Sequence, residues 1–443
     1  MTIEAIDLPD RLTLDQLRDI WSVLTTDERF EGFRALDRPT AEDLFLALSS
    51  ADQYELLAAL PEPERRSWIR LLAPDDAADL IQASVRDHRE GFMALLDDPT
   101  RTEVVALLAY AEDDAGGLMN PRYARLRPDM SVDEAINYLR KQASGRMEAL
   151  YYVYVLDSHQ KLLGVVSMRG LFKAPPDRHV QDIMETDLVT AAEELDQEEM
   201  SLLFAEHDLV AIPVIDADGC MKGIVTVDDI VDVVREEATE DMQKYGAMAV
   251  LEEPYLDLSV CQMLGKRVGW LAVLFFGELL TASAMRYFEE DIARAVVLAL
   301  FIPLIISSGG NSGSQASTLV IRAMALGEIR LRDWWRVMKR EIVSGLALGS
   351  FLGVLGFLRI VGWQLAFDLY GEHYVLIALT VGISLAGVVL WGTLAGSMLP
   401  FLLRRFKFDP ASASAPFVAT LVDVSGIGIY FGAASLILSG TLL

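Results

Sequence analysis

Hydrophobic and polar residues follow three successive patterns along the chain. From about residue 12 to 125, short Leu-rich segments begin with Ser, Thr or Pro followed by acids, as at Thr40, Ser50 and Pro74. Such capping residues, followed by apolar residues at i, i+3 and i+4, are typical of short α-helices. We therefore predict an acidic helical N-terminal domain over residues 1–126, built as a small superhelix.

The second pattern is β-rich and occurs twice between residues 127 and 236. The run 152–157, followed by 164–167, matches the run 211–216, followed by 223–226, at a constant offset of 59 positions. Each copy predicts a strand, a turn around an Asp, a second strand that ends in Gly-x-x-Ser/Thr, and a helix. This arrangement resembles a tandem CBS pair, an α/β module, which we expect over residues 127–236.

The third pattern consists of five long apolar segments. Each is long enough for the roughly 20 residues that a membrane-spanning helix requires. We expect a charged connecting helix over residues 237–265 and a five-span α-helical transmembrane domain over residues 266–443. The five apolar segments lie near residues 268–288, 293–326, 342–366, 374–403 and 412–441.

Basic residues lie in alternate loops between these segments. The other loops carry acids, at residues 289–291 and at Asp368 and Glu372. Because basic loops remain in the cytosol, this pattern predicts a cytosolic N-terminus and a C-terminus outside. The basic loop residues are Lys266, Arg267, Arg330, Arg332, Arg336, Lys339, Arg340, Arg404, Arg405 and Lys407.

Charge is divided unevenly along the chain, which has a net charge of −27. Residues 1–260 hold 54 acids and 24 basic residues, whereas residues 261–443 hold 11 and 14. Strong acidity disfavours nucleic acid as a partner and favours cations. The two cysteines, Cys220 and Cys261, fit neither a disulfide framework nor a thiolate metal site. The N-terminus has no signal-peptide pattern, so we expect the acidic half in the cytosol.

The second apolar segment contains a polar, glycine-rich run from Ser307 to Ser317. Small residues let helices approach closely, so one interpretation is a tight helix–helix seam. The alternative is a pore lining, because a Gly-Gly step weakens a helix and freed carbonyls are tolerated in a membrane only where they are buried or face water. We favour the pore lining because Asn311 and Gln315 lie beside Gly309 and Gly310.

Two acids fall within the apolar segments. Asp423 is the only residue charged at neutral pH between Asp409 and the C-terminus, and no basic residue occurs in its segment. A carboxylate at membrane depth costs about 2.5–3.5 kcal/mol, so it indicates a function, and a transported cation is the obvious counter-charge. Carboxylate and carbonyl oxygens suit Mg²⁺. Glu278 either faces the same pathway or bonds a neighbouring helix.

Several motifs in the same order resemble the MgtE family of Mg²⁺ channels. They include 112–119 at the junction with the CBS pair, 303–315 and 321–323 in the second segment, and 419–426 in the fifth. The resemblance implies a multi-pass homodimer in the lipid bilayer of the bacterial inner (plasma) membrane, with the connecting helix as a pore plug. It also implies a pore site for hydrated Mg²⁺, which we expect at Asp423, Ala419, Asn311 and Gly426.

The resemblance further implies that cytosolic Mg²⁺ closes the pore by binding between the acidic faces of the helical and CBS domains. Divalent ions that bridge facing carboxylates would remove the repulsion among the uncompensated charges of the acidic half. The family's regulatory positions fall on Asp43, Asp75, Asp79, Glu198, Asp208, Asp229, Asp232, Glu237, Glu240 and Asp241.

Nucleotide binding departs from the family pattern. Some members bind ATP at the first repeat, with an Asp three residues after the strand-terminal Ser and an aromatic residue for adenine. Here these positions hold Gly170 and Leu209, although Tyr152 and Arg169 are present. We therefore do not expect tight ATP binding.

Two other functions remain open. An ion-coupled secondary transporter of divalent cations such as Mn²⁺ or Co²⁺ would show two matching broken helices, whereas we find one candidate. A membrane-anchored CBS ligand sensor would need neither the polar run nor Asp423. With five His, no P-loop and no nucleophile elbow, the sequence does not predict an enzyme.

Overall fold

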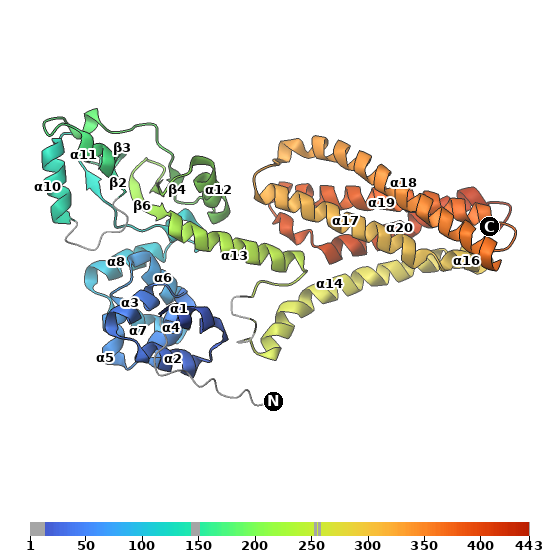
Figure 1. Ribbon diagram of the computed structural model, residues 1–443, viewed down its shortest axis with the longest axis horizontal. Coiled ribbons are helices and arrows are strands. Elements are labelled where there is room, and N and C mark those ends of the chain that lie inside the picture. The colour runs from blue at the N-terminus through green and yellow to red at the C-terminus, as the bar shows by residue number, and fades with distance from the viewer. Residues whose placement is uncertain (1–13, 143–150, 252–254, 256–257, 443) are drawn as a thin grey trace. The chain divides into compact units, whose positions relative to one another are not determined.

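The computed structural model describes residues 14–142, 151–251, 255 and 258–442. The chain divides into two compact units, Met1–Val234 and Arg235–Leu443, and the division falls inside one helix, α13. Figure 1 labels the helices and strands of both units. The first 13 residues, where we expect no signal peptide, lie outside the described residues.

Short helices follow one another from Leu14, as the sequence pattern predicts. Thr25 and Glu28 form a capping box that starts α2, Ser49 caps α4, and Pro74 begins α6. The elements are α1 (Leu14–Ile20), η1 (Trp21–Val23), α2 (Thr26–Ala35), α3 (Arg38–Leu46), α4 (Ser50–Ala59), α5 (Glu62–Ile69), α6 (Pro74–Ala83), α7 (Arg86–Leu95), α8 (Asp98–Leu107) and α9 (Ala115–Leu118).

Two three-stranded sheets repeat the same register. Tyr152 pairs with Ser167 in the first sheet and Ala211 pairs with Thr226 in the second, so the 59-residue offset holds in three dimensions. The first sheet has the order β1 (Arg125–Leu126), β2 (Tyr152–Leu156), β3 (Leu162–Ser167), and the second has the order β4 (Ala191–Ala192), β5 (Ala211–Ile215), β6 (Met221–Thr226). The accompanying helices are α10 (Val132–Gln142), α11 (Met168–Lys173), η2 (Val180–Asp182), α12 (Gln197–His207) and α13 (Val227–Tyr245).

The helical region and the second repeat share one hydrophobic core. Leu57 and Ile69 of the helices belong to the same buried cluster as Ile212 and Val225 of the second sheet. The first repeat has a separate core, which includes Val153. Burial of apolar surface stabilises each cluster, so the helical region and the second repeat stabilise one another.

Among the described residues, five helices are long and apolar enough to cross a membrane, which confirms the predicted spans. In Figure 1, α17 to α20 form a bundle with α14 at its edge. The elements are α14 (Val260–Tyr287), α15 (Glu289–Arg294), α16 (Val296–Ala299), α17 (Ile302–Ala325), η3 (Leu331–Asp333), α18 (Trp334–Phe367), α19 (Tyr374–Arg405), η4 (Pro410–Ser412) and α20 (Ala415–Leu438).

Helix α17 runs unbroken through the Gly-Gly step, which corrects the expectation of freed carbonyls there. A Cβ atom on Gly309 would lie 3.0 Å from the carbonyl oxygen of Val388, and one on Gly313 would lie 2.8 Å from that of Gly392. Close packing on α19 therefore compensates the low helix propensity of glycine. The seam interpretation is correct for these two glycines.

The connecting segment also differs from the prediction. The expected helix over residues 237–265 is interrupted, because α13 ends at Tyr245 and α14 begins at Val260. Gly246 is followed by Ala247 at a positive φ of 56°, which a continuing helix does not allow. Ser259 then starts α14 with its own capping box. Residues 252–254 and 256–257 of this segment lie outside the described residues.

The expected boundary at residue 126 also shifts. Arg125 and Leu126 form β1, which pairs in parallel with β2 of the first sheet. The first CBS-like sheet therefore includes residues that the sequence pattern assigned to the helical domain.

Candidate functional site

The fifth membrane helix, α20, places Asp423 and Ala419 one turn apart against α17. A Cβ atom on Gly310 would lie 3.4 Å from the Ala419 Cα atom and 4.0 Å from Asp423 Oδ1. Gly310 therefore leaves space in front of the carboxylate because it has no side chain. Asp423 is half-buried. The Ala419 carbonyl belongs to a continuous helix, and a helical carbonyl keeps a second lone pair that can accept a bond from an ion's water.

Polar side chains of α17 form a stripe on the surface of the bundle. The stripe consists of Ser307, Asn311, Gln315 and Thr318, all of which are exposed in the single chain. Asn311 Nδ2 donates a hydrogen bond to Ser307 Oγ at 3.5 Å. Exposed hydroxyl and amide groups at membrane depth are unfavourable against lipid. The stripe therefore requires water or a protein partner.

Two other polar or small residues of this region have packing roles. Ser312 shares a buried hydrogen bond of 2.7 Å with Thr393 of α19. Gly426, which we expected in the pore site, is buried, and a Cβ atom there would lie 3.2 Å from Val388 Cγ1. It faces α19 rather than the open side of Asp423, so we leave it out of the candidate ion site.

Glu278 of α14 joins Asp423. The two carboxyl groups lie within hydrogen-bonding reach of one another. The sequence alone left open whether Glu278 faces this pathway or bonds a neighbouring helix, and the structure places it beside the carboxyl group of the candidate pathway.

The end of α13 contacts the membrane helices of its own unit. The Tyr245 hydroxyl donates a hydrogen bond of 2.9 Å to the carbonyl oxygen of Ser314 and is also hydrogen-bonded to the Thr318 hydroxyl. Lys244 Nζ forms an ion pair of 2.6 Å with Asp409 Oδ2, in the connection between α19 and α20. These contacts hold the last turn of α13 over the end of the α17 stripe.

Acids surround Lys244 at this contact. Glu240 also pairs with Lys244. Burial raises the pKa of Asp241 to about 6, and the charges of Asp409 and Glu237 add to the rise. Sequence reasoning identified three of these acids but missed Asp409, which lies far away in the sequence. Asp409 lies in a basic loop, near Lys407, and nothing in that position predicts a contact with α13.

A second acidic group lies between the helical region and the second repeat. Thr226 Oγ1 donates a hydrogen bond of 2.6 Å to Asp229 Oδ2. Burial raises the pKa of Asp229 to about 6 despite this bond, and the charges of Asp228 and Asp76 add to the rise. Burial, together with the charge of Asp228, also raises the pKa of Asp76. Asp76, which was not among the expected regulatory acids, therefore belongs to this group.

The remaining expected regulatory acids are spread over this unit. Asp75 is buried and accepts a hydrogen bond of 3.2 Å from Asn120 Nδ2. Asp79 is half-buried one turn further along α6, and Asp43, Glu198, Asp208 and Asp232 are exposed. Within residues 14–142, 151–251, 255 and 258–442, no three His, Cys, Asp or Glu side chains form a group that could hold a metal ion.

We predict that acid stabilises the fold around Asp229. A carboxyl group whose pKa is about 6 when folded and near 3.8 when unfolded binds its proton more tightly in the folded state. The stabilisation is therefore complete below pH 4 and is lost as the pH rises through 6, amounting to about 3 kcal/mol. Urea unfolding in EDTA of a fragment that ends after α13 should show this dependence, measured against Asp229→Asn. An equal pH dependence in the two proteins would contradict it.

The expected nucleotide positions fall on different parts of this unit. Tyr152 begins β2 and is half-buried, and Arg169 is exposed on α11. The Ser167 hydroxyl accepts a hydrogen bond of 3.1 Å from the Gly170 backbone N–H, which makes it the cap of α11. Leu209 packs on the core that the helical region shares with the second repeat.

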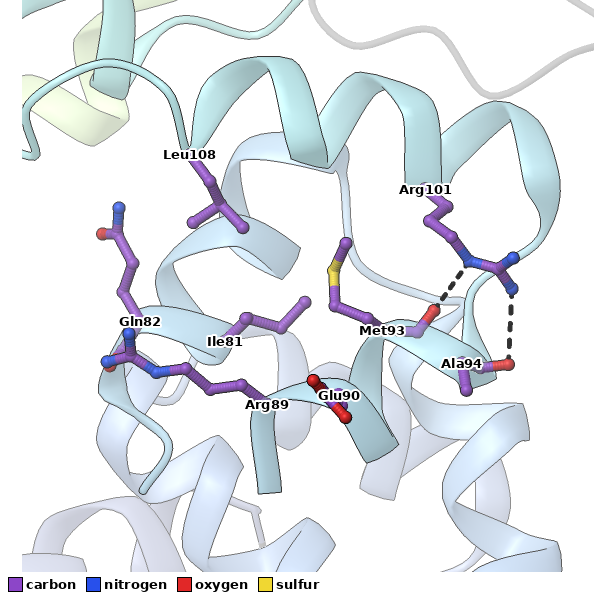
Figure 2. Close-up of a pocket in the computed structure, with 8 residues that line it drawn as sticks. All are labelled: Ile81, Gln82, Arg89, Glu90, Met93, Ala94, Arg101 and Leu108. Carbon is purple, nitrogen blue, oxygen red and sulfur yellow. Dashed lines mark hydrogen bonds between the residues drawn. The ribbon is translucent and has the colours of Figure 1, made fainter. Parts of the chain in front are cut away.

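A cavity of about 590 Å³ lies among α6, α7 and α8 (Figure 2). Arg101 donates hydrogen bonds to the carbonyl oxygens of Met93 and Leu96, and Arg89 donates to those of Gln82 and Ser84. Both guanidinium groups satisfy helix-end carbonyls, which is a structural role. We assign no ligand to this cavity.

Comparisons with known proteins agree on the identity of the parts. Residues 302–433 match the MgtE family, described as a divalent cation transporter, residues 12–113 match the MgtE intracellular N domain, and residues 115–177 and 180–236 match CBS domains. The chain is 42% identical over 344 residues to the magnesium transporter MgtE of Thermus thermophilus, which covers 78% of this chain and 74% of the relative. The magnesium transporter MgtE of Bacillus subtilis is 34% identical over 332 residues, with 75% and 71% covered.

A solved structure of the cytosolic domain of the Mg²⁺ channel MgtE in complex with ATP is also similar. It is 38% identical, covers 51% of this chain and 91% of its own, and has a TM-score of 0.47. Both magnesium transporters are more than 30% identical to this chain over more than two thirds of their own length, which establishes the family. The chain therefore belongs to the MgtE family of divalent cation transporters and is a membrane transporter rather than an enzyme.

Proposed function

We propose that the chain forms a homodimeric Mg²⁺ channel of the bacterial inner membrane, with the ion path beside Asp423. The observation that carries this proposal is the half-buried Asp423 carboxylate, in front of Gly310 and without a basic residue in its helix. The relatives named as magnesium transporters support Mg²⁺ as the ion. Asn311 and the Ala419 carbonyl would contact the water shell that Mg²⁺ retains.

A second copy of the chain is needed to enclose this path. The α17 stripe is exposed in the single chain, and α14 has no buried residue. Facing stripes from two copies around a two-fold axis would place polar groups toward a shared water-filled space. The basic loops support a cytosolic N-terminus and a C-terminus outside.

We infer that cytosolic Mg²⁺ closes the channel by bridging acids. Asp229 lies near Asp76 and Asp228, and Asp241 lies near Glu237, Glu240 and Asp409. Neither set forms a metal-holding group within the described residues, so a bridging ion would draw the carboxylates together. Raised carboxyl pKa values report repulsion and lost hydration, both of which a divalent ion would relieve. The other expected positions, Asp43, Asp75, Asp79, Glu198, Asp208 and Asp232, would contribute facing carboxylates when Mg²⁺ is bound.

ATP would bind this chain weakly. Leu209 packs into a core and Gly170 cannot hold ribose hydroxyl groups, which leaves Tyr152 and Arg169 with an incomplete site. The complex with ATP described above concerns the related protein and not this chain.

Flux into liposomes tests the proposal. Purified protein should admit Mg²⁺ down its gradient, faster with a negative interior potential and without any H⁺ or Na⁺ gradient, and should elute as a dimer. Empty liposomes supply the baseline. Flux that required a proton or sodium gradient would indicate the ion-coupled transporter instead.

A further inference from the structure

Glu278 lies beside a close contact between α14 and α20. A Cβ atom on Gly277 would overlap the Thr420 methyl group, so the absence of a side chain at residue 277 lets α14 pack closely on α20 here. Glu278 and Asp423 follow these contact residues on their respective helices, and their carboxyl groups are within hydrogen-bonding reach. The contact of Gly277 with Thr420 therefore lies close to the point where the two acids meet.

The two helices that carry the pair offer no basic counter-charge at its level. Lys and Arg are absent from residues 268–285 of α14 and from all of α20, and His is absent from both helices. Glu278 is exposed in the single chain, on the side where α14 covers Asp423. Two carboxyl groups in apolar surroundings require a cation or a shared proton between them, because like charges at this distance repel strongly.

We propose that Glu278 is the second carboxylate of the Asp423 ion site and determines its specificity. This inference rests on the function proposed above. One carboxylate with carbonyls suits an ion that keeps its water shell, as Mg²⁺ does. A second carboxylate raises the ligand charge to match a divalent ion and favours direct coordination, which benefits Mn²⁺ and Co²⁺ more than Mg²⁺.

The test compares Glu278→Gln, Glu278→Asp and Asp423→Asn in proteoliposomes, using Mg²⁺ flux and its inhibition by Co²⁺. In Glu278→Gln the half-saturating Mg²⁺ concentration should rise about tenfold and the inhibitory Co²⁺ concentration should rise by more, so that the Co²⁺ preference falls. Glu278→Asp should keep part of that preference because it retains the charge. Glu290→Gln, the same change outside the membrane, is the matched control.

The outcomes separate this inference from the function on which it rests. If Glu278 only positioned Asp423, its removal would lower the flux of every ion by one factor and leave the Co²⁺ preference unchanged, which would overturn the inference. An unchanged half-saturating Mg²⁺ concentration in Glu278→Gln, with an inactive Asp423→Asn, would overturn it as well while leaving the pore site intact. Full Mg²⁺ flux in Asp423→Asn would instead overturn the proposed ion path itself.

Discussion

Replacing Asp423 by asparagine is expected to abolish Mg²⁺ flux while leaving the protein folded. The substitution keeps the shape of the side chain and removes the charge that draws a divalent ion into the membrane. No other charged side chain of α20 can balance the charge of an ion at this depth, so we expect the Mg²⁺ flux to fall roughly 100-fold or more. Radiometric or fluorescent Mg²⁺ uptake into proteoliposomes measures the effect.

Asp368→Asn supplies the matched control for this experiment. Asp368 caps α18 in a left-handed conformation that asparagine also adopts, and it is exposed outside the apolar part of the helix. Its neutralisation should leave flux within a factor of about two, since a screened surface charge contributes little. Equal flux in the two variants would remove Asp423 from the ion path.

Neutralising Asp229, Asp232 and Glu237 together is expected to leave the channel open at millimolar cytosolic Mg²⁺. The cytosolic half keeps most of its negative charge in this triple variant, so repulsion persists while carboxylates that a bridging ion would use are gone. The Mg²⁺ concentration that closes the channel should therefore rise by about tenfold or more. Single-channel recording with Mg²⁺ varied on the cytosolic side measures it.

Three exposed acids of the helical region provide a control with the same charge change. Glu31, Asp87 and Glu90 are all exposed on their helices, and their combined neutralisation should not move the closing concentration. If both triple variants closed at the same Mg²⁺ concentration as the unmodified channel, Asp229, Asp232 and Glu237 would have no role in closing and would only be hydrated surface charges. Limited proteolysis with and without Mg²⁺ would report the same transition.

Sequence reasoning succeeded where the signal was local or periodic. The 59-residue offset predicted the paired sheets because register within a hairpin follows from alternation and turn chemistry. Asp157 and Asp216 even make equivalent turns, each accepting bonds from two backbone N–H groups. The five spans followed from the length of their apolar runs.

Features that depend on contacts between distant segments could not be predicted. The Gly-Gly step suggested a broken helix, but α17 is continuous because its glycines pack closely against α19. Asp409 joined the α13 acids, and Glu278 joined Asp423, only through packing of helices far apart in the sequence. A single sequence shows which residues carry charge but not which charges meet.

The glycine seam between α17 and α19 has a consequence for synthesis. Glycine carbonyls of α17 lie where side chains on Gly392 and Gly396 of α19 would stand, and α18 separates the two helices in the chain. While α19 is still in the ribosome, α17 is in the bilayer without the helix against which its small and polar residues pack. We therefore expect nascent chains that stop before α19 to be recognised as incomplete by membrane quality-control proteases, and chains that include it to become resistant.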